Sequence, residues 1–326
     1  MLRRLFILCS SLTSAWALST SPRTLLNGVA AQTKAWPLSA SRRSHLARVA
    51  IFAATQHIPA AGATTDEVSA VLQDVRWDDE NPFSRADFRR LDENDDLRFY
   101  DEPRLVYHID AAAVAATAAF YAREFDAQLR MKSAPIDVLD VCSSWVSHYP
   151  PANVVPVGRV AGLGMNAEEL KANNRLTEWV VRDLNKDPTL PYANESFDAV
   201  TCTVSVRLPR PPPCQANAQD VSNARLWCAP QIDYLTKPLA VMSEAARVLR
   251  PGGVLAIVFS NRLFFSKAVA IWTGKDDLDH VYTVGAYVHY GAGTQFGGLR
   301  AIDLTPRKQR GSKGGDPLYA VVATRQ

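Results

Sequence analysis

The chain has 326 residues, of which 47% are hydrophobic and 21% charged, a composition typical of a globular protein and not of a disordered or fibrous one. Its formal net charge of +3 is unevenly distributed. Seven basic residues and no acidic residue precede Asp66, so the remainder carries a net charge of about −4. Nucleic-acid binding is therefore not expected. The five cysteines have no zinc-ligand spacing, so neither a metal site nor a disulfide framework is predicted.

Residues 1–65 have the composition of a targeting leader that is removed from the mature protein. Arg3 and Arg4 precede a short apolar run, and Ala15-Trp16-Ala17 is a small-x-small cleavage site. A stretch rich in Ser, Thr, Arg and Ala follows. This order resembles a bipartite plastid leader; a mitochondrial leader is the alternative. The apolar run is too short to span a bilayer, so no stable membrane span is predicted.

Residues 66–134 are expected to form an N-terminal helical extension or lid. An alanine-rich helix is predicted from Ala111 to about Leu129, ending before Pro135. Tyr100, Tyr107 and His108 are candidates for aromatic lid residues over a substrate, with packing of the segment as the alternative.

From residue 135 to 326, strand and helix signals alternate. Apolar runs predict strands over 136–141, 159–164, 178–183, 197–204, 254–259, 299–304 and 318–323, with helices beginning near Asn166 and covering 239–249. Such alternation favours an α/β fold. We expect a Rossmann-like, doubly wound, mostly parallel seven-stranded sheet with helices on both faces.

Two sequence motifs within this region precede the fourth and the fifth predicted strand. Asp183-Leu184-Asn185 leads through Leu190-Pro191-Tyr192 to the fourth strand, and Arg247-Val248-Leu249-Arg250-Pro251-Gly252-Gly253 precedes the fifth. With the strand order, they resemble class I S-adenosylmethionine-dependent methyltransferases of the type 11 kind, over roughly residues 136–326. The resemblance implies S-adenosylmethionine as cofactor, with Asp183 accepting the adenine amino group; a plain strand-end cap is the other interpretation.

The chain departs from this family at two places. Ser143-Ser144-Trp145 replaces the glycine-rich loop after the first strand, and Asn166 stands where an acid accepts the ribose hydroxyls. In these two places the chain resembles a divergent subgroup of these methyltransferases, which has the motifs Ser-Ser-Trp-Val-Ser-His and Gly-Leu-Gly-Met-Asn. The serine hydroxyls and the amides of a following helix are expected to hold a carboxylate, unless the serines only cap that helix and Trp145 is core. The cofactor-binding candidates are Asp140, Ser143, Ser144, Trp145, Gly164, Met165, Asn166, Asp183 and Leu184.

Asp140 is expected to accept hydrogen bonds from amides of this loop. His148 is a candidate general base for the acceptor, with a structural histidine as the alternative. The predicted function is methyl transfer to an unidentified small molecule. A methyltransferase fold that has lost its cofactor and serves as a binding or assembly protein is the alternative. A dehydrogenase is disfavoured because no Gly-x-Gly-x-x-Gly follows the first strand. Oligomeric state does not follow from the sequence.

Residues 207–232 interrupt the domain with an irregular, proline-rich insert. Removing them joins Val206 to Asp233 and restores the spacing of the family. Two interpretations remain: a lid at the substrate entrance, or a retained intron.

Overall fold

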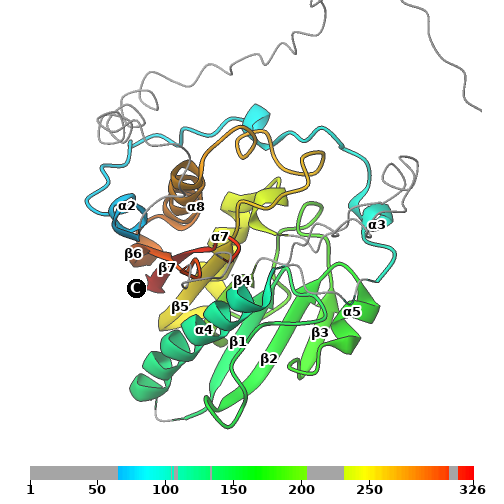
Figure 1. Ribbon diagram of the computed structural model, residues 1–326, viewed down its shortest axis with the longest axis vertical. Coiled ribbons are helices and arrows are strands. Elements are labelled where there is room, and N and C mark those ends of the chain that lie inside the picture. Colours follow the sequence, from blue (N-terminus) through cyan, green and yellow to red (C-terminus); the bar gives the residue numbers. More distant parts are fainter. Residues whose placement is uncertain (1–64, 104, 106–108, 133, 204–230, 308–314) are drawn as a thin grey trace, which may run out of the picture. The chain divides into compact units, whose positions relative to one another are not determined.

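The computed structural model describes residues 65–103, 105, 109–132, 134–203, 231–307 and 315–326. They contain a seven-stranded sheet in the order β3-β2-β1-β4-β5-β7-β6 (Figure 1). Strands β1 to β5 are parallel to one another, whereas β7 lies antiparallel between β5 and β6. The mostly parallel α/β sheet expected from the sequence is confirmed.

The strands begin and end close to the predicted positions. They are β1 (Ile136–Val141), β2 (Val157–Gly164), β3 (Glu178–Val181), β4 (Phe197–Thr203), β5 (Leu249–Phe259), β6 (Phe296–Asp303) and β7 (Tyr319–Arg325). The third strand is shorter than expected, so Asp183 lies two residues beyond its end.

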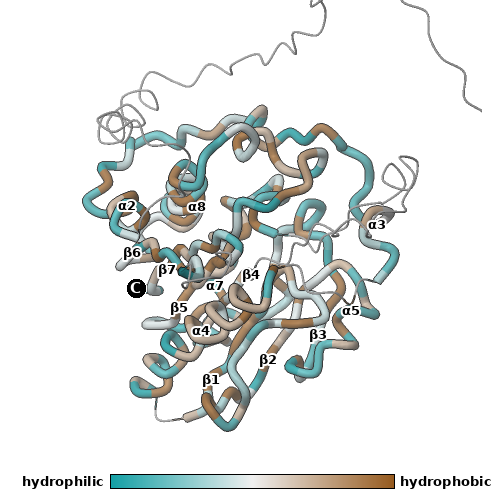
Figure 2. Tube along the Cα trace, viewed as in Figure 1, coloured by the Kyte–Doolittle hydropathy of each residue, from teal (hydrophilic) through white to brown (hydrophobic). Residues whose placement is uncertain are grey.

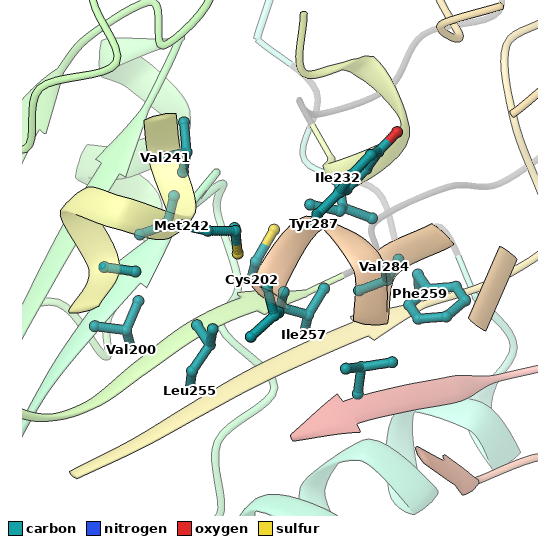
Figure 3. Packing of buried hydrophobic residues seen from close by; sticks show 14 of the residues in the cluster. Val200, Cys202, Ile232, Val241, Met242, Leu255, Ile257, Phe259, Val284 and Tyr287 are labelled. Carbon is teal, nitrogen blue, oxygen red and sulfur yellow. The ribbon is translucent and has the colours of Figure 1, made fainter. Parts of the chain in front are cut away.

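Helices cover both faces of the sheet. Helix α4 (Ala111–Lys132) contacts β1 and β5 on one face, and α7 (Pro238–Val248) and α8 (Asp277–Ala292) pack against each other on the opposite face. Successive strand residues point to opposite faces, so Leu139 belongs to the core under α7 and α8, and Val138 to the core under α4. Hydrophobic residues follow the central strands (Figure 2), and Figure 3 shows Met242 beside Cys202 and Val284 beside Phe259.

The N-terminal segment contributes to the core. It contains α2 (Thr65–Ala70), the single turn η1 (Arg85–Phe88) and the short α3 (Asp96–Phe99). Val68 is fully buried, and the Trp77 ring stacks on His289 of α8 with a centroid distance of 4.8 Å. The Ile271 amide donates a hydrogen bond of 2.9 Å to the Asp87 carbonyl. This segment is therefore tied to the C-terminal half of the fold at several points.

One expected helix is absent, and one helix was not predicted. No helix follows β1, because residues 142–156 form an irregular connection to β2. Cys142 and His148 have positive φ angles of 61° and 54°, and Pro150 and Pro151 follow at once, so a continuous helix cannot form there. Conversely, α8 was not predicted, although its signals are present: the Asp276 side chain caps it by accepting from the Asp279 amide, and Gly293 ends it at φ 56°.

The leader interpretation and most of the insert, residues 204–230, lie outside the described residues. Of the helices that the structure describes, none has the length and apolarity needed to cross a membrane.

Candidate functional site

The carboxyl ends of β1, β2 and β3 meet around one small pocket. Its lining includes Cys142 after β1, Gly164 and Met165 at the end of β2, and Asp183 and Leu184 after β3. Parallel α/β sheets bind ligands at this edge. The free interior volume is only ≈ 10 Å³, about the room that one water molecule needs. Asp96 and Tyr100 of the N-terminal segment, and Tyr234 and Leu235 beyond β4, complete the wall.

A larger cavity of ≈ 930 Å³ shares part of this wall. Asp96, Asp183 and Asn185 line both spaces. The rest of the cavity is strongly charged, and its basic lining residues are Arg85, Arg89, Arg90, Lys186 and Lys237. A volume of this size is in the range that binds a small molecule or nucleotide-type cofactor.

Asp183 stands where the two spaces meet. Its Oδ1 accepts the Asn185 amide at 2.9 Å, which fixes the carboxylate. Its Oδ2 lies 3.9 Å from the Lys186 ammonium, and the side chain is 9% exposed. A buried carboxylate oxygen held in this way has lone pairs left for a donor such as an exocyclic amine.

Asp140, at the end of β1, is surrounded by hydroxyl groups. Its Oδ2 accepts hydrogen bonds from Ser143 at 2.8 Å and Ser147 at 2.6 Å, and its Oδ1 accepts one from Thr201 at 3.4 Å. The expectation that it bonds loop amides is thus replaced by bonds to hydroxyls. Burial raises its pKa to about 6, although the three hydroxyls pull the pKa down.

The loop after β1 uses its polar groups internally. The Ser144 hydroxyl donates to Glu169 at 2.6 Å, and the Asn173 amide donates to the Ser144 carbonyl at 2.8 Å. The Ser143 carbonyl lies against Gly164, so closely that a Cβ on that glycine would clash with the carbonyl oxygen. Gly164 therefore permits contact between loop and strand. With no helix after β1, the predicted helix-terminal amides for a carboxylate do not exist.

Asn166 is also committed to internal contacts. Its Oδ1 caps α5 (Ala167–Ala172) by accepting the Glu168 amide at 2.9 Å, as the sequence predicted for this helix start. Its Nδ2 donates to the carbonyls of Tyr100 and Asp101 at 2.8 and 3.1 Å. The residue at the expected ribose position thus fastens the N-terminal segment over the sheet edge.

Trp145 and His148 lie outside the lining of both spaces. Trp145 is half-buried, and His148 is buried. Burial lowers the pKa of His148 to about 4, so its imidazole is neutral at physiological pH. A role as general base stays a prediction. Tyr100 lines the small pocket, whereas Tyr107 and His108 lie outside the described residues.

Two groups were not anticipated from the sequence. Lys267, 1% exposed, lies 3.0 Å from Asp96 and 3.1 Å from Asp92, and Arg90 bonds the other oxygen of Asp96 at 2.7 Å. Asp233, in the turn η2 (Ile232–Tyr234), is 2% exposed. The only sequence signal for Asp233 is its position: removal of the insert places it directly after the fourth strand. In the ranges that the structure describes, no cluster of three or more His, Cys, Asp and Glu residues is arranged for a metal ion.

The residues around the edge fit S-adenosylmethionine in part. Asp183 and the adjoining cavity offer the acceptor and the volume that an adenosine group needs. The pocket nearer Cys142 and Met165 is too small for the methionine portion while Asp96 and Tyr100 line it. Four of the nine cofactor candidates, Gly164, Met165, Asp183 and Leu184, line this pocket.

Comparisons with known proteins gave matches only among solved structures. No family model matches the chain, and no curated protein does. The matching structures include a possible histamine N-methyltransferase from Thermotoga maritima, with 11% identity, a TM-score of 0.35, and coverage of 64% of this chain and 92% of that one.

They also include magnesium protoporphyrin IX methyltransferase from Synechocystis with bound S-adenosylmethionine, with 10% identity, a TM-score of 0.36, and coverage of 66% and 80%. A third is the [4+2]-cyclase SpnF, with 14% identity, a TM-score of 0.38, and coverage of 63% and 81%. The assignment of the fold rests on the strand order and pairing of the sheet itself.

Proposed function

We propose that this protein is an S-adenosylmethionine-dependent methyltransferase acting on a small molecule. The observation that carries the proposal is the position of Asp183: a fixed, nearly buried carboxylate that lines both a 930 Å³ cavity and the pocket at the ends of β1 to β3. The sequence resemblance assigns the adenine amino group to this same residue.

In this proposal the chain supplies alignment and exclusion of water. A bound sulfonium is already a good electrophile, so the protein need only hold an acceptor in line and keep solvent away. Asp183 would hold the adenine, and Leu184 and Met165 would pack beside it. Asp96 and Tyr100 must withdraw from the pocket before a ligand enters and would cover it afterwards.

Binding measurements test the proposal directly. Calorimetry of the full chain with S-adenosylhomocysteine should show binding that Asp183→Ala weakens at least tenfold, about 1.4 kcal/mol. Asp187→Ala is a matched control on the same connection, since Asp187 is 55% exposed and pairs with Arg182. Absence of binding at millimolar concentration, or wild-type affinity in Asp183→Ala, would contradict the proposal.

One observation favours a second candidate function. The hydroxyls of Ser143, Ser144 and Ser147 already donate to Asp140 and Glu169. These hydroxyls donate within the protein and not to a cofactor. This is expected of a methyltransferase fold that has lost its cofactor and serves as a binding or assembly protein. Failure to bind S-adenosylhomocysteine, together with a normal melting transition, would favour this alternative.

We also propose a plastid location and an origin of residues 207–232 as a retained intron. The support is the leader composition and the restored spacing when the insert is removed. Imaging a fluorescent fusion of residues 1–65 tests the first, with a mitochondrial signal as the contrary result. Detection of peptides covering residues 216–225 in the native protein would refute the second.

A further inference from the structure

Asp233 is a buried carboxylic acid that the described protein leaves unbonded. Neither of its carboxyl oxygens reaches solvent or accepts a hydrogen bond within 3.5 Å in the part of the chain that the structure describes. Its backbone is firmly held: the Val269 amide donates to the Asp233 carbonyl at 3.0 Å, and the Phe264 amide donates to the neighbouring Tyr234 hydroxyl at 2.7 Å. A buried acid without a partner is costly, so its retention in a rigid turn calls for an explanation.

In the part of the chain that the structure describes, acids and thiols act on this region, and no ion pair joins Asp233 to a cation. Asp233 acts electrostatically on the Cys142 thiol, which lines the small pocket. The Cys142 thiol forms a hydrogen bond with the Cys202 thiol, and the Asp140 carboxyl acts electrostatically on Cys142 from the end of β1. The Tyr234 phenol is the other titratable group that acts on Asp233. None of the described ion pairs includes Asp140 or Asp233.

Asp140 and Asp233 both act on the Cys142 thiol that lines the pocket, and neither forms an ion pair among the described residues, so a positively charged ligand is favoured there. A cation placed between them would gain attraction that solvent does not screen, since the region is closed to water. Burial raises the pKa of Asp233 to about 8, partly offset by its own amide and Tyr234. The free protein therefore holds a proton on Asp233 at neutral pH and can release it when a cation arrives.

We propose that Asp233 binds the nitrogen of the methyl acceptor, and that the acceptor is an amine. This inference rests on the proposed methyltransferase function. An ammonium entering the pocket pairs with the ionised carboxylate, while the proton formerly on Asp233 leaves to solvent. One N–H bond then breaks, its proton moves to an Asp233 oxygen, and the nitrogen lone pair becomes free to act as the nucleophile. After transfer, Asp233 keeps the proton taken from the nitrogen, which restores its state in the free protein, so that one turnover releases only the proton lost on binding.

Proton counting by calorimetry tests this assignment in the full chain. Benzylamine and n-butylamine, titrated at pH 6.5 in buffers of different ionisation enthalpy, should each bind with release of about one proton, since binding converts a protonated acid to its ionised form. Benzyl alcohol and n-butanol should release none. Asp233→Asn should weaken amine binding at least tenfold and abolish proton release. Asp279→Asn is the control and should change neither amine binding nor proton release. Burial also raises the pKa of Asp279, but this residue lies on α8 and pairs with Lys275, which precedes the helix.

Parallel titrations with S-adenosylhomocysteine separate the two proposals. Binding of S-adenosylhomocysteine without proton release by either amine would overturn the amine assignment and leave the methyltransferase proposal standing. Amine binding that depends on Asp233 without S-adenosylhomocysteine binding would leave an amine site at Asp233 but overturn the methyltransferase proposal, and with it the role of the amine as methyl acceptor. If Asp233→Asn melted below wild type at pH 7, Asp233 would have a partner within the protein, and the inference would be wrong.

Discussion

Asp140 and Asp233 are two buried aspartates that both act on the Cys142 thiol of the small pocket, and they differ in their hydrogen bonds. Asp140 accepts three hydroxyl hydrogen bonds, and burial raises its pKa only to about 6. Neither Asp233 oxygen has a hydrogen-bond partner within 3.5 Å in the described part of the chain, and burial raises its pKa to about 8, although its own amide and Tyr234 lower it. The first therefore belongs to a finished structural unit, and the second is left available for a ligand.

The contrast shows how a sheet edge can be rigid and reactive at once. Hydroxyls around Asp140 fix the loop after β1, and that loop in turn packs on Gly164 of β2. Asp233 lies beyond β4, on a turn held by backbone hydrogen bonds that leave its side chain out. A backbone can thus be held rigidly while the side chain that it carries has no hydrogen-bond partner.

The largest expected effect concerns the hydrogen-bonded loop around Asp140. Gly164→Ala should reduce the free energy of unfolding by about 3–4 kcal/mol, because the added methyl group would displace the Ser143 carbonyl and with it the hydroxyls around Asp140. Urea denaturation measures the change. Gly158→Ala, where the nearest atom to an added Cβ would be the Pro135 Cβ at 3.3 Å, should cost under about 1 kcal/mol. Equal losses in both variants would mean that the loop does not depend on Gly164.

The pH dependence of stability compares the two acids directly. Between pH 3.8 and about 8 the folded protein keeps the Asp233 proton and the unfolded chain loses it, so wild-type stability falls as pH rises. The slope relative to Asp233→Asn should approach 1.4 kcal/mol per pH unit. After the cost of a buried amide, Asp233→Asn should gain about 2–3 kcal/mol at pH 7.

Asp140 should behave differently in the same measurement. Its pH window closes near 6, and Asp140→Asn deprives the Ser143, Ser147 and Thr201 hydroxyls of their carboxylate acceptor. That loss offsets the gain from removing a buried charge, so a net change within about 1 kcal/mol at pH 7 is expected. A gain as large as that of Asp233→Asn would abolish the distinction between the two acids.

A smaller effect is expected at the contact that covers the pocket. Asn166→Asp keeps the oxygen that caps α5 but replaces the Nδ2 donor with an oxygen facing the carbonyls of Tyr100 and Asp101. Stability should fall by about 1 kcal/mol, and hydrogen exchange should accelerate over residues 96–101. Asn173→Asp, which alters a donor to the Ser144 carbonyl instead, should leave exchange of 96–101 unchanged.

Local patterns predicted the fold well. The periodicity of α7 and its Pro-Gly-Gly stop, and the apolar runs of β1, β4 and β5, placed these elements within a few residues, because burial of strands in a parallel sheet demands continuous apolar sequence. The sequence did not reveal that the connection after β1 is irregular and contains no helix. Ser143 and Ser144 are common helix caps, and only long-range partners such as Glu169 divert them.

The site was predicted by position more than by chemistry. Gly164, Met165, Asp183 and Leu184 reached the pocket because strand ends determine where they lie. Asn166 matched its strand end as well, but its amide bonds Tyr100, some 66 residues away in the chain, and no local pattern predicts such a contact. Asp233 escaped notice because an irregular insert separates it from its strand.

The burial of α2 limits how far the chain can be shortened from its amino terminus. Val68 is fully enclosed in the main core, where Val71 and Leu72 join it, and the Leu72 side chain occupies the space beside Gly285 of α8. Removal of residues from the amino terminus up to Thr65 would leave these buried side chains in place. A cut ten residues later would remove a piece of the interior and leave α8 with an exposed apolar groove, which a cell's quality control would recognise as damage.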